Sequence, residues 1–258
     1  MKRVALSTPF VAILLFTVVS QAFSQTQTSS QPPVRDPQAL SLLQASATAM
    51  GNVVPSDSTA TGTITTEAGT LTENGTITIM TRGTDQSSEQ IQTPHGAILV
   101  YSRGQASNGA PLSGQRAMTS QSSFFPLPLI GAALNNSDSG FKYVGIETVN
   151  GSSAHHIQFW NSFASNPTGL TLSAFSTRDI WIDATSYLPL RISYVQRAAG
   201  GSAPRIAVDL FFANYQNVGG ILYPFSIQKS FNGTPSATIT IQQVVFNTGL
   251  SDSNFPVQ

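Results

Sequence analysis

The sequence predicts a mainly β protein: a curled antiparallel sheet, or half-barrel, with an N-terminal helix and a second short apolar helix as its lid. Between Asp179 and Phe255, apolar and polar residues alternate along several short stretches with little charge. Side chains on a strand alternate between faces, so each stretch presents one apolar and one mostly polar face. One such apolar set is Ile206, Val208, Leu210 and Phe212. The pattern therefore describes a one-sided sheet.

The clearest helix spans Pro37 to Met50. Asp36 offers an oxygen to cap its first turn, Pro37 suits the first helical position, and Gly51 follows as a stop signal. Apolar residues recur between them at helical spacing, namely Leu40, Leu43, Ala47 and Met50. This spacing predicts a helix with one modest apolar stripe.

Strands alternate with turn signals from Thr59 to Trp160. The strands expected here are Thr59–Glu67, Gly75–Thr81, Ser87–Thr93, Gly96–Ser102, Phe141–Val149 and Ala154–Trp160. Glu73–Gly75, Pro94–Gly96 and Asn150–Gly151 are typical of tight turns. We expect loops at residues 103–116 and 161–174.

Phe124 to Leu134 contains no polar side chain. Eleven such residues in succession favour either of two interpretations. The segment is a mobile lid, or a loop that meets a bilayer or a partner. Alternatively, it is a short buried helix that plugs one end of the sheet.

The balance of sheet and helix predicts a hollow. Nine to eleven strands make a sheet roughly 45 Å wide, whereas a helix of about fifteen residues is only about 22 Å long and 10 Å across. The helices cannot cover such a sheet, which must curl, close or fold over to hide its apolar face. A curled sheet with small lids leaves an apolar hollow that suits a lipid or another apolar ligand.

The N-terminus has the pattern of a secretory signal peptide. Lys2 and Arg3 precede an uncharged run from Phe10 to Val19, and small residues lead to a predicted cleavage after Ser24. The run is shorter than the about 20 residues that a membrane span needs. We therefore expect residues 1–24 to be removed and the product to be periplasmic or secreted. The sequence has no cysteine, so it is not expected to be a lipoprotein.

Residues 25–35 are polar and Pro-containing and predict a disordered leader, which leaves residues 36–258 as a single domain.

Composition limits the partners that the protein can bind. Twelve basic and twelve acidic residues balance, and charged residues make up 9% of the chain against a typical ~25%. Nucleic-acid binding is not expected without a basic stripe. We expect a monomer whose contact with an envelope membrane would be hydrophobic.

No residue pattern predicts catalysis, a metal site or a cofactor. His155 and His156 are adjacent, so on a strand they point to opposite faces and cannot easily share an ion. Asp179 and Asp183 lie about 13 Å apart along a strand, beyond the ~5–9.5 Å of paired glycosidase carboxylates. No Gly-x-Ser-x-Gly elbow precedes a helix. We predict that the protein is not an enzyme.

The C-terminal half carries a resemblance. The runs Asp179–Asp183, Tyr187–Arg191, Asn214–Gly220, Leu222–Phe225 and Leu250–Phe255, with Asn247, resemble the LolA/LolB-type outer-membrane lipoprotein-sorting superfamily, in particular its periplasmic relatives. The helix at Pro37 and the hairpin Val149–Ile157 fit the same layout. Unlike the membrane-anchored member, this chain has no cysteine to carry acyl groups.

The resemblance implies a half-barrel that holds acyl chains on its concave apolar face under a helical lid. Leu40 and Leu43 would belong to the lid. The second lid or mouth would be formed by Phe124, Phe125, Leu127, Leu129 and Ile130. The strands would line the hollow with Leu190, Ile192, Tyr194, Leu210, Phe212, Tyr223, Phe225 and Ile227.

The function predicted from these observations is a carrier or binding protein for a lipid, an acylated molecule or another apolar ligand, with a possible envelope membrane or lipoprotein partner. It would act by sequestration. Two alternatives stay open: a secreted β-sandwich for adhesion or assembly with a dry core, and a lipid-sensing regulatory domain of the half-barrel fold.

Overall fold

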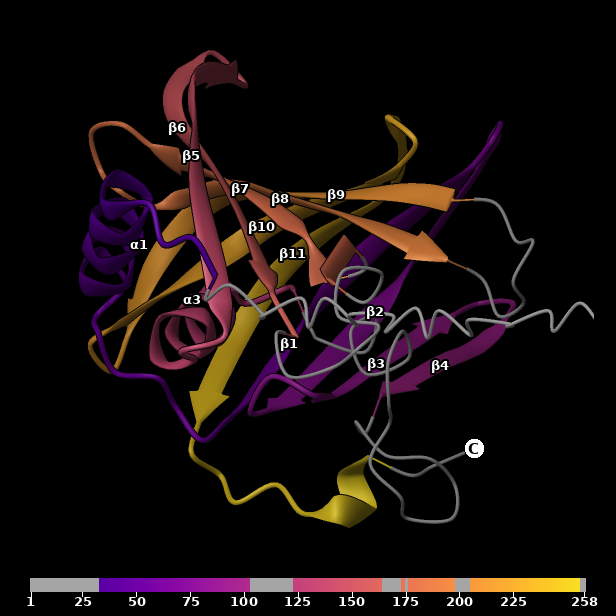
Figure 1. Ribbon diagram of the computed structural model, residues 1–258. Helices are drawn as coiled ribbons and strands as arrows, with labels where there is room; N and C mark the ends of the chain where they lie inside the picture. The colour runs from indigo at the N-terminus through magenta and orange to yellow at the C-terminus, as the bar shows by residue number, and fades with distance from the viewer. Residues whose placement is uncertain (1–32, 103–122, 164–172, 175, 198–204, 256–258) are drawn as a thin grey trace, which may run out of the picture. The chain divides into compact units, whose positions relative to one another are not determined.

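The computed structural model describes residues 33–102, 123–163, 173–174, 176–197 and 205–255. Eleven strands of these residues form one sheet (Figure 1). In chain order they are β1 (Asp57–Ala68), β2 (Leu71–Arg82), β3 (Gln86–Thr93), β4 (Gly96–Ser102), β5 (Ser139–Val149), β6 (Ser152–Asn161), β7 (Arg178–Asp183), β8 (Pro189–Arg197), β9 (Arg205–Val218), β10 (Ile221–Phe231) and β11 (Thr234–Phe246). A short 3-10 helix, η1 (Asp252–Asn254), follows them.

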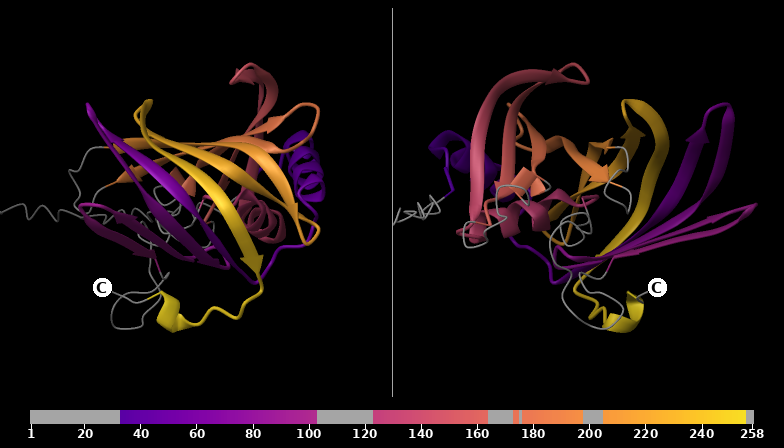
Figure 2. Two further views of the ribbon diagram at one scale, coloured as in Figure 1. Left: turned by 180° about the vertical axis from the view of Figure 1, so that it is seen from behind. Right: turned by 45° about the vertical axis from the view of Figure 1, so that its right-hand side comes forward.

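The strand order is β4-β3-β2-β1-β11-β10-β9-β8-β7-β6-β5, and every pairing is antiparallel. The first strand, β1, therefore lies beside the last, β11. Among the described residues no pairing joins the edge strands β4 and β5, so the curled sheet stays open (Figure 2). The predicted half-barrel is confirmed. The β-sandwich alternative is wrong, because a sandwich needs two sheets and the strands of the described residues form one.

The N-terminal helix, α1 (Pro37–Ala49), begins where the sequence predicts and ends one residue before the predicted Met50, which is its C-cap. The Asp36 carboxylate accepts hydrogen bonds from the backbone N–H groups of Gln38 and Ala39. At the other end, the Met50 carbonyl accepts a hydrogen bond from the N–H of Leu222, the second residue of β10. A Cβ on Gly51 would lie 2.3 Å from the Gly220 carbonyl oxygen, so only glycine allows this close approach.

The second helix, α3 (Pro126–Asn135), lies inside the curve of the sheet, between β5 and β6 on one side and β2 to β4 on the other (Figure 2). Pro126 and Pro128 fall in its first turn, where backbone N–H groups have no intrahelical partner to lose. Residues 124–131 and Ala133 are buried. Of the two interpretations of this apolar segment, the buried helix is correct.

One predicted turn is displaced. The β1–β2 hairpin turns at Gly69 and Thr70, and the predicted turn Glu73–Gly75 lies within β2. Gly75 serves close strand packing instead, since a Cβ there would lie 2.3 Å from the carbonyl oxygen of Gln92 on β3. The Asn150–Gly151 turn is confirmed, and both residues have the positive φ, 49° and 85°, that a tight hairpin turn requires.

The predicted leader ends earlier than residue 35. The Val34 carbonyl accepts a hydrogen bond from the N–H of Phe141 on β5, and the Arg35 guanidinium donates to the carbonyls of Leu134 and Asn136 at the end of α3. The predicted signal peptide, the start of the leader, the loop 103–116 and most of the loop 161–174 lie outside the described residues. Within the described part, no helix is long and apolar enough to cross a membrane.

Candidate functional site

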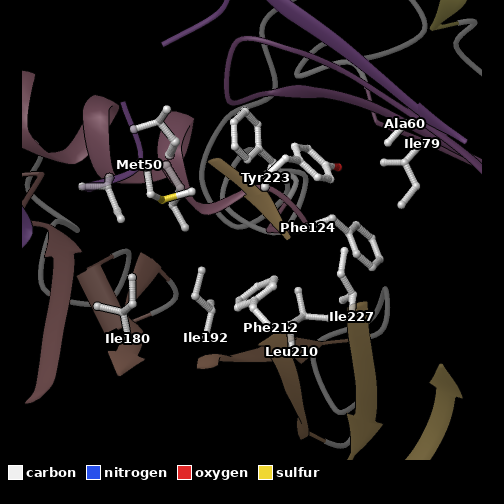
Figure 3. Packing of buried hydrophobic residues seen from close by; sticks show 14 of the residues in the cluster. Met50, Ala60, Ile79, Phe124, Ile180, Ile192, Leu210, Phe212, Tyr223 and Ile227 are labelled. Carbon is white, nitrogen blue, oxygen red and sulfur yellow. The ribbon is translucent and has the colours of Figure 1, made fainter. Parts of the chain in front are cut away.

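The concave face of the sheet, the side that carries α3, holds the main apolar cluster of the described residues. All the predicted ligand-binding residues except Leu190 belong to this cluster or pack against it. Leu40 and Tyr194 are half-buried and the others are buried. Figure 3 shows Met50, Ile180, Ile192, Phe212 and Tyr223 turned toward one another in this core. These side chains therefore fill the helix-covered part of the half-barrel.

Leu190 lies on the opposite face. The β7–β8 register shifts there, because Trp181 pairs with Arg191 while Ile182 pairs with Pro189, which leaves Leu190 as an extra residue. Its side chain packs against the outer cluster of Val149, Ala154 and Trp181. The two-residue alternation used to place Leu190 beside Ile192 fails at this bulge.

Tyr223 is fully buried, and its hydroxyl has no hydrogen-bond partner among the described residues. Figure 3 shows this oxygen turned toward Ala60 and Ile79, on β1 and β2. Burial raises the pKa of Tyr223 well above its ordinary value. The phenol therefore stays neutral and serves the core as an aromatic ring, tilted against Phe125 at 4.7 Å between centroids.

A hollow of about 270 Å³ lies over the other part of the concave face, where β1, β2, β3, β10 and β11 run. Its apolar walls are Ile64, Ile77, Ile91, Phe124, Phe231, Ala237 and Ile239, and its polar members are Thr66, Glu67, Glu89, Lys229 and Ser236. Glu67 and Phe231 are exposed, so the hollow reaches the protein surface.

Of the residues predicted to bind ligand, only Phe124 lines this hollow. Sequence reasoning missed the isoleucines, which stand among threonines in β1, β2 and β11. Their alternation with threonine was a usable signal, as in Thr76-Ile77-Thr78-Ile79 and Thr238-Ile239-Thr240-Ile241. The predicted aromatic residues of β9 and β10, Phe212, Tyr223 and Phe225, belong instead to the main apolar cluster, together with residues of α1 and α3.

Two opposite charges meet at the hollow. Glu89 on β3 and Lys229 on β10 are separated by three strands, yet the curl brings Lys229 Nζ to 4.0 Å from Glu89 Oε2. Their side chains are 19% and 22% exposed. Lys229 Nζ also lies 5.4 Å from the ring centres of Phe124 and Phe231. Burial raises the pKa of the Glu89 carboxyl, although the Lys229 ammonium opposes this shift.

Further polar groups stand on the concave face beyond the isoleucines of β7 and β8. Arg178 and Tyr194 pair across these strands, two residues from the buried pair Ile180 and Ile192. The Arg178 guanidinium lies 5.3 Å from the centre of the Tyr194 ring. Burial raises the pKa of Tyr194 to about 12, so the phenol is neutral. This end of the concave face is therefore amphipathic: the apolar Ile180 and Ile192 lie next to the polar Arg178 and Tyr194.

The outer face of the sheet carries a separate network of polar side chains around His156. His155 and His156 point to opposite faces, as predicted. His155 Nδ1 lies 3.1 Å from the Tyr143 hydroxyl, whereas His156 lies between the carboxylates of Glu147 (2.8 Å) and Asp179 (2.9 Å) and stacks on Trp181.

These outer contacts tie neighbouring strands together. Glu147 also accepts a hydrogen bond from the Trp181 indole, which links β5 to β7. Asp183 accepts hydrogen bonds from Thr185 and Ser186 and so shapes the β7–β8 turn, as the sequence suggested. Within the described ranges, no group of three or more His, Asp or Glu side chains could hold a metal ion.

Comparison with solved structures identifies the fold. A LolA superfamily protein from Nitrosomonas europaea aligns with a TM-score of 0.50 at 14% identity, over 84% of this chain and 97% of that one. A DUF1329 family protein from Desulfovibrio piger aligns with a TM-score of 0.50 at 13% identity, over 84% and 97%. An outer membrane lipoprotein-sorting protein domain from Vibrio parahaemolyticus gives 0.49 at 16% identity, over 84% and 96%.

Sequence comparison adds no family assignment to this likeness of fold. Neither a scan against protein-family models nor a search of curated proteins found a match. At these identities the structural likeness concerns the fold alone. The chain has the fold of LolA superfamily proteins, as its strand and turn pattern suggested.

Proposed function

We propose that this protein binds a lipid or another apolar molecule in the hollow over β1, β2, β3, β10 and β11 and carries it by sequestration. The observation that supports the proposal most directly is the hollow itself, whose walls are largely hydrocarbon and which reaches the surface beside Glu67 and Phe231. Its volume of about 270 Å³ is close to the lower end of the roughly 300–1,000 Å³ usual for small-molecule sites.

The volume of the hollow favours a ligand with one acyl chain over a ligand with two. Each buried methylene contributes about 0.8 kcal/mol, so a single acyl chain along the isoleucine walls would bind without any ionic contact. The residues of α3 and α1 play a supporting part in this proposal. They fill the other part of the half-barrel and hold Phe124 at the edge of the hollow.

Binding fits the walls better than catalysis does. Most of the wall, including Ile64, Ile77 and Ile239, offers a ligand dispersion contacts and water exclusion, and groups that could transfer a proton are confined to its few polar members. The proposal includes the periplasmic or secreted location inferred from the N-terminal sequence, and an acylated molecule or an envelope membrane as the source of the ligand.

The test is native mass spectrometry followed by lipid extraction, on protein purified from its own cell envelope. We expect one apolar molecule per chain. Ala237, 8% exposed, lines the hollow, so Ala237→Phe should fill it and abolish the bound mass. Ala213 is exposed on β9, and Ala213→Phe is the matched control that should keep it.

Two results would count against binding in this hollow. One is retention of the ligand by a folded Ala237→Phe variant. The other is wild-type protein that carries no ligand and takes up no N-phenylnaphthylamine, a neutral fluorescent apolar probe.

A further inference from the structure

The hollow is hydrocarbon along most of its wall and charged at one place. Ile64, Ile77 and Ile239 form the apolar part, whereas Glu89 and Lys229 meet across the opening from opposite arms of the curl. An apolar molecule without a polar end would leave the Lys229 ammonium and the Glu89 carboxyl facing hydrocarbon. The cost of placing charge against an apolar surface makes that arrangement unfavourable.

Lys229 is the cation of the hollow. Its side chain is only 22% exposed, and its ammonium stands over the faces of Phe124 and Phe231. These rings favour a cation in place. At 4.0 Å, its contact with the Glu89 carboxyl is too long for a hydrogen bond, so the ammonium donors can still reach a guest.

Glu89 is suited to assist an anion. Burial raises the pKa of its carboxyl, which favours the neutral acid. In that form it donates one O–H hydrogen bond. Among the described residues, the other titratable groups near this pair are Glu67, which is exposed at the mouth, and Tyr194, whose phenol is neutral. When the acid is neutral, Lys229 and Glu89 together present one positive charge and an added hydrogen-bond donor, 4.0 Å apart.

We infer that the hollow selects a single-chain amphiphile with an anionic head, a carboxylate or a phosphate monoester. Its head lies between Lys229 and Glu89, and its chain runs along Ile64, Ile77 and Ile239. This inference rests on the proposed function and specifies its ligand. A cationic head would meet the Lys229 ammonium, and an alcohol would leave that charge unmatched.

The experiment compares ligands that share one chain length and differ in the head. Myristate, tetradecyl phosphate, tetradecanol and tetradecylamine each displace N-phenylnaphthylamine from the purified full chain near pH 7. We expect both anions to bind at least about tenfold more tightly than tetradecanol, a difference of about 1.4 kcal/mol. Tetradecylamine should bind most weakly. Comparison of the two anions tells a fatty-acid head from a phosphate head.

Variants locate the selectivity. Lys229→Met keeps the length of the side chain and removes its charge, so the anions and tetradecanol should bind alike. Lys229→Arg should restore the preference. Lys142, exposed on β5, is the other lysine in the described part of the chain, and Lys142→Met should retain the wild-type preference. Circular dichroism checks that each variant is folded.

The outcomes separate this inference from the proposed function. If wild-type protein binds tetradecanol as tightly as myristate, or tetradecylamine most tightly, the inference is overturned while apolar binding stands. If the probe itself does not bind to the wild-type protein, so that there is nothing for the four ligands to displace, the proposed function fails too. The wild-type comparison decides the charge preference even if Lys229→Met does not fold.

Discussion

Asp57, the first residue of β1, holds the chain that leaves β11. Its carboxylate accepts hydrogen bonds from the backbone N–H and the hydroxyl of Thr248 and from the N–H of Gly249. Burial by itself would raise the pKa of Asp57, but these hydrogen bonds outweigh it and lower the pKa below 3.8. The charged form is therefore the one that stabilises the fold.

This relationship predicts a pH dependence of stability. Because the native pKa of Asp57 lies below the unfolded value, its contribution is complete above about pH 5 and is lost as the pH falls through the native pKa. Urea unfolding between about pH 6 and pH 3 should show a declining free energy of unfolding that is less steep in Asp57→Asn. Glu67→Gln, an exposed change on the same strand, is the control. Equal slopes in Asp57→Asn and wild type would contradict the prediction.

The buried helix α3 should contribute strongly to stability. Leu127 is fully buried in the main cluster, so Leu127→Ala should lower the free energy of unfolding by about 2–5 kcal/mol. Leu71, 71% exposed at the start of β2, provides the matched control, and Leu71→Ala should change it by no more than about 0.5 kcal/mol. Urea denaturation followed by tryptophan fluorescence measures both. A similar small effect at the two sites would mean that α3 is not held in the core.

Gly62 should tolerate no side chain. It lies at the bulge between β1 and β11, and a Cβ there would stand 2.1 Å from the carbonyl oxygen of Thr240. Because that atom belongs to the backbone, Gly62→Ala must move the strands apart and should cost about 1–3 kcal/mol. Thr63→Ala, at an exposed neighbouring position, is the control. An unchanged denaturation midpoint for Gly62→Ala would refute the close approach.

The Arg191–Asp209 pair should show strong coupling on the outer face. The Arg191 Nε and Nη2 atoms donate to one Asp209 carboxylate oxygen at 3.0 and 2.6 Å, and the Asp209 side chain is only 9% exposed. Arg191→Met leaves that carboxylate without its cation and should cost about 3 kcal/mol, the low end for a broken buried pair. Arg191 also stacks on Trp181, so part of the loss is packing.

A double-mutant cycle with Asp209→Asn isolates the electrostatic part of this loss. We expect the double variant to lose less stability than the sum of the single variants, by more than about 0.5 kcal/mol. Additive losses would indicate that the pair contributes through packing alone.

The sequence predicts most of the elements because local patterns determine them. Asp36 with Pro37 locates the start of α1, and Asn150 with Gly151 locates a hairpin, since each depends on the backbone chemistry of neighbouring residues. The one-sided strands also predict the curl. The prediction of a turn at Gly75 was wrong, because position 75 requires glycine for a different reason: the backbone of Gln92, on the neighbouring strand β3, approaches it closely.

The location of the hollow could not be predicted in the same way. Phe212 and Phe225 carry the larger apolar side chains, but whether such a face is filled by protein or left open depends on where α3 packs. That depends on contacts such as those of Arg35 with the end of α3, which are remote in sequence. Likewise, the pairing of Glu89 with Lys229 depends on how tightly the sheet curls, a property of the whole sheet.

The pairing of β1 with β11 sets the order in which the chain can complete its fold. The hairpin strands β1 to β4 are made early, yet β1 acquires its second neighbour only when the last strand has emerged. Loop closure over such a sequence separation is slow, and sheets dominated by distant pairings refold in milliseconds to seconds. Until then β1 presents an unpaired edge that can join another chain. A chain truncated before β11 is thus expected to aggregate rather than to fold as a shorter sheet.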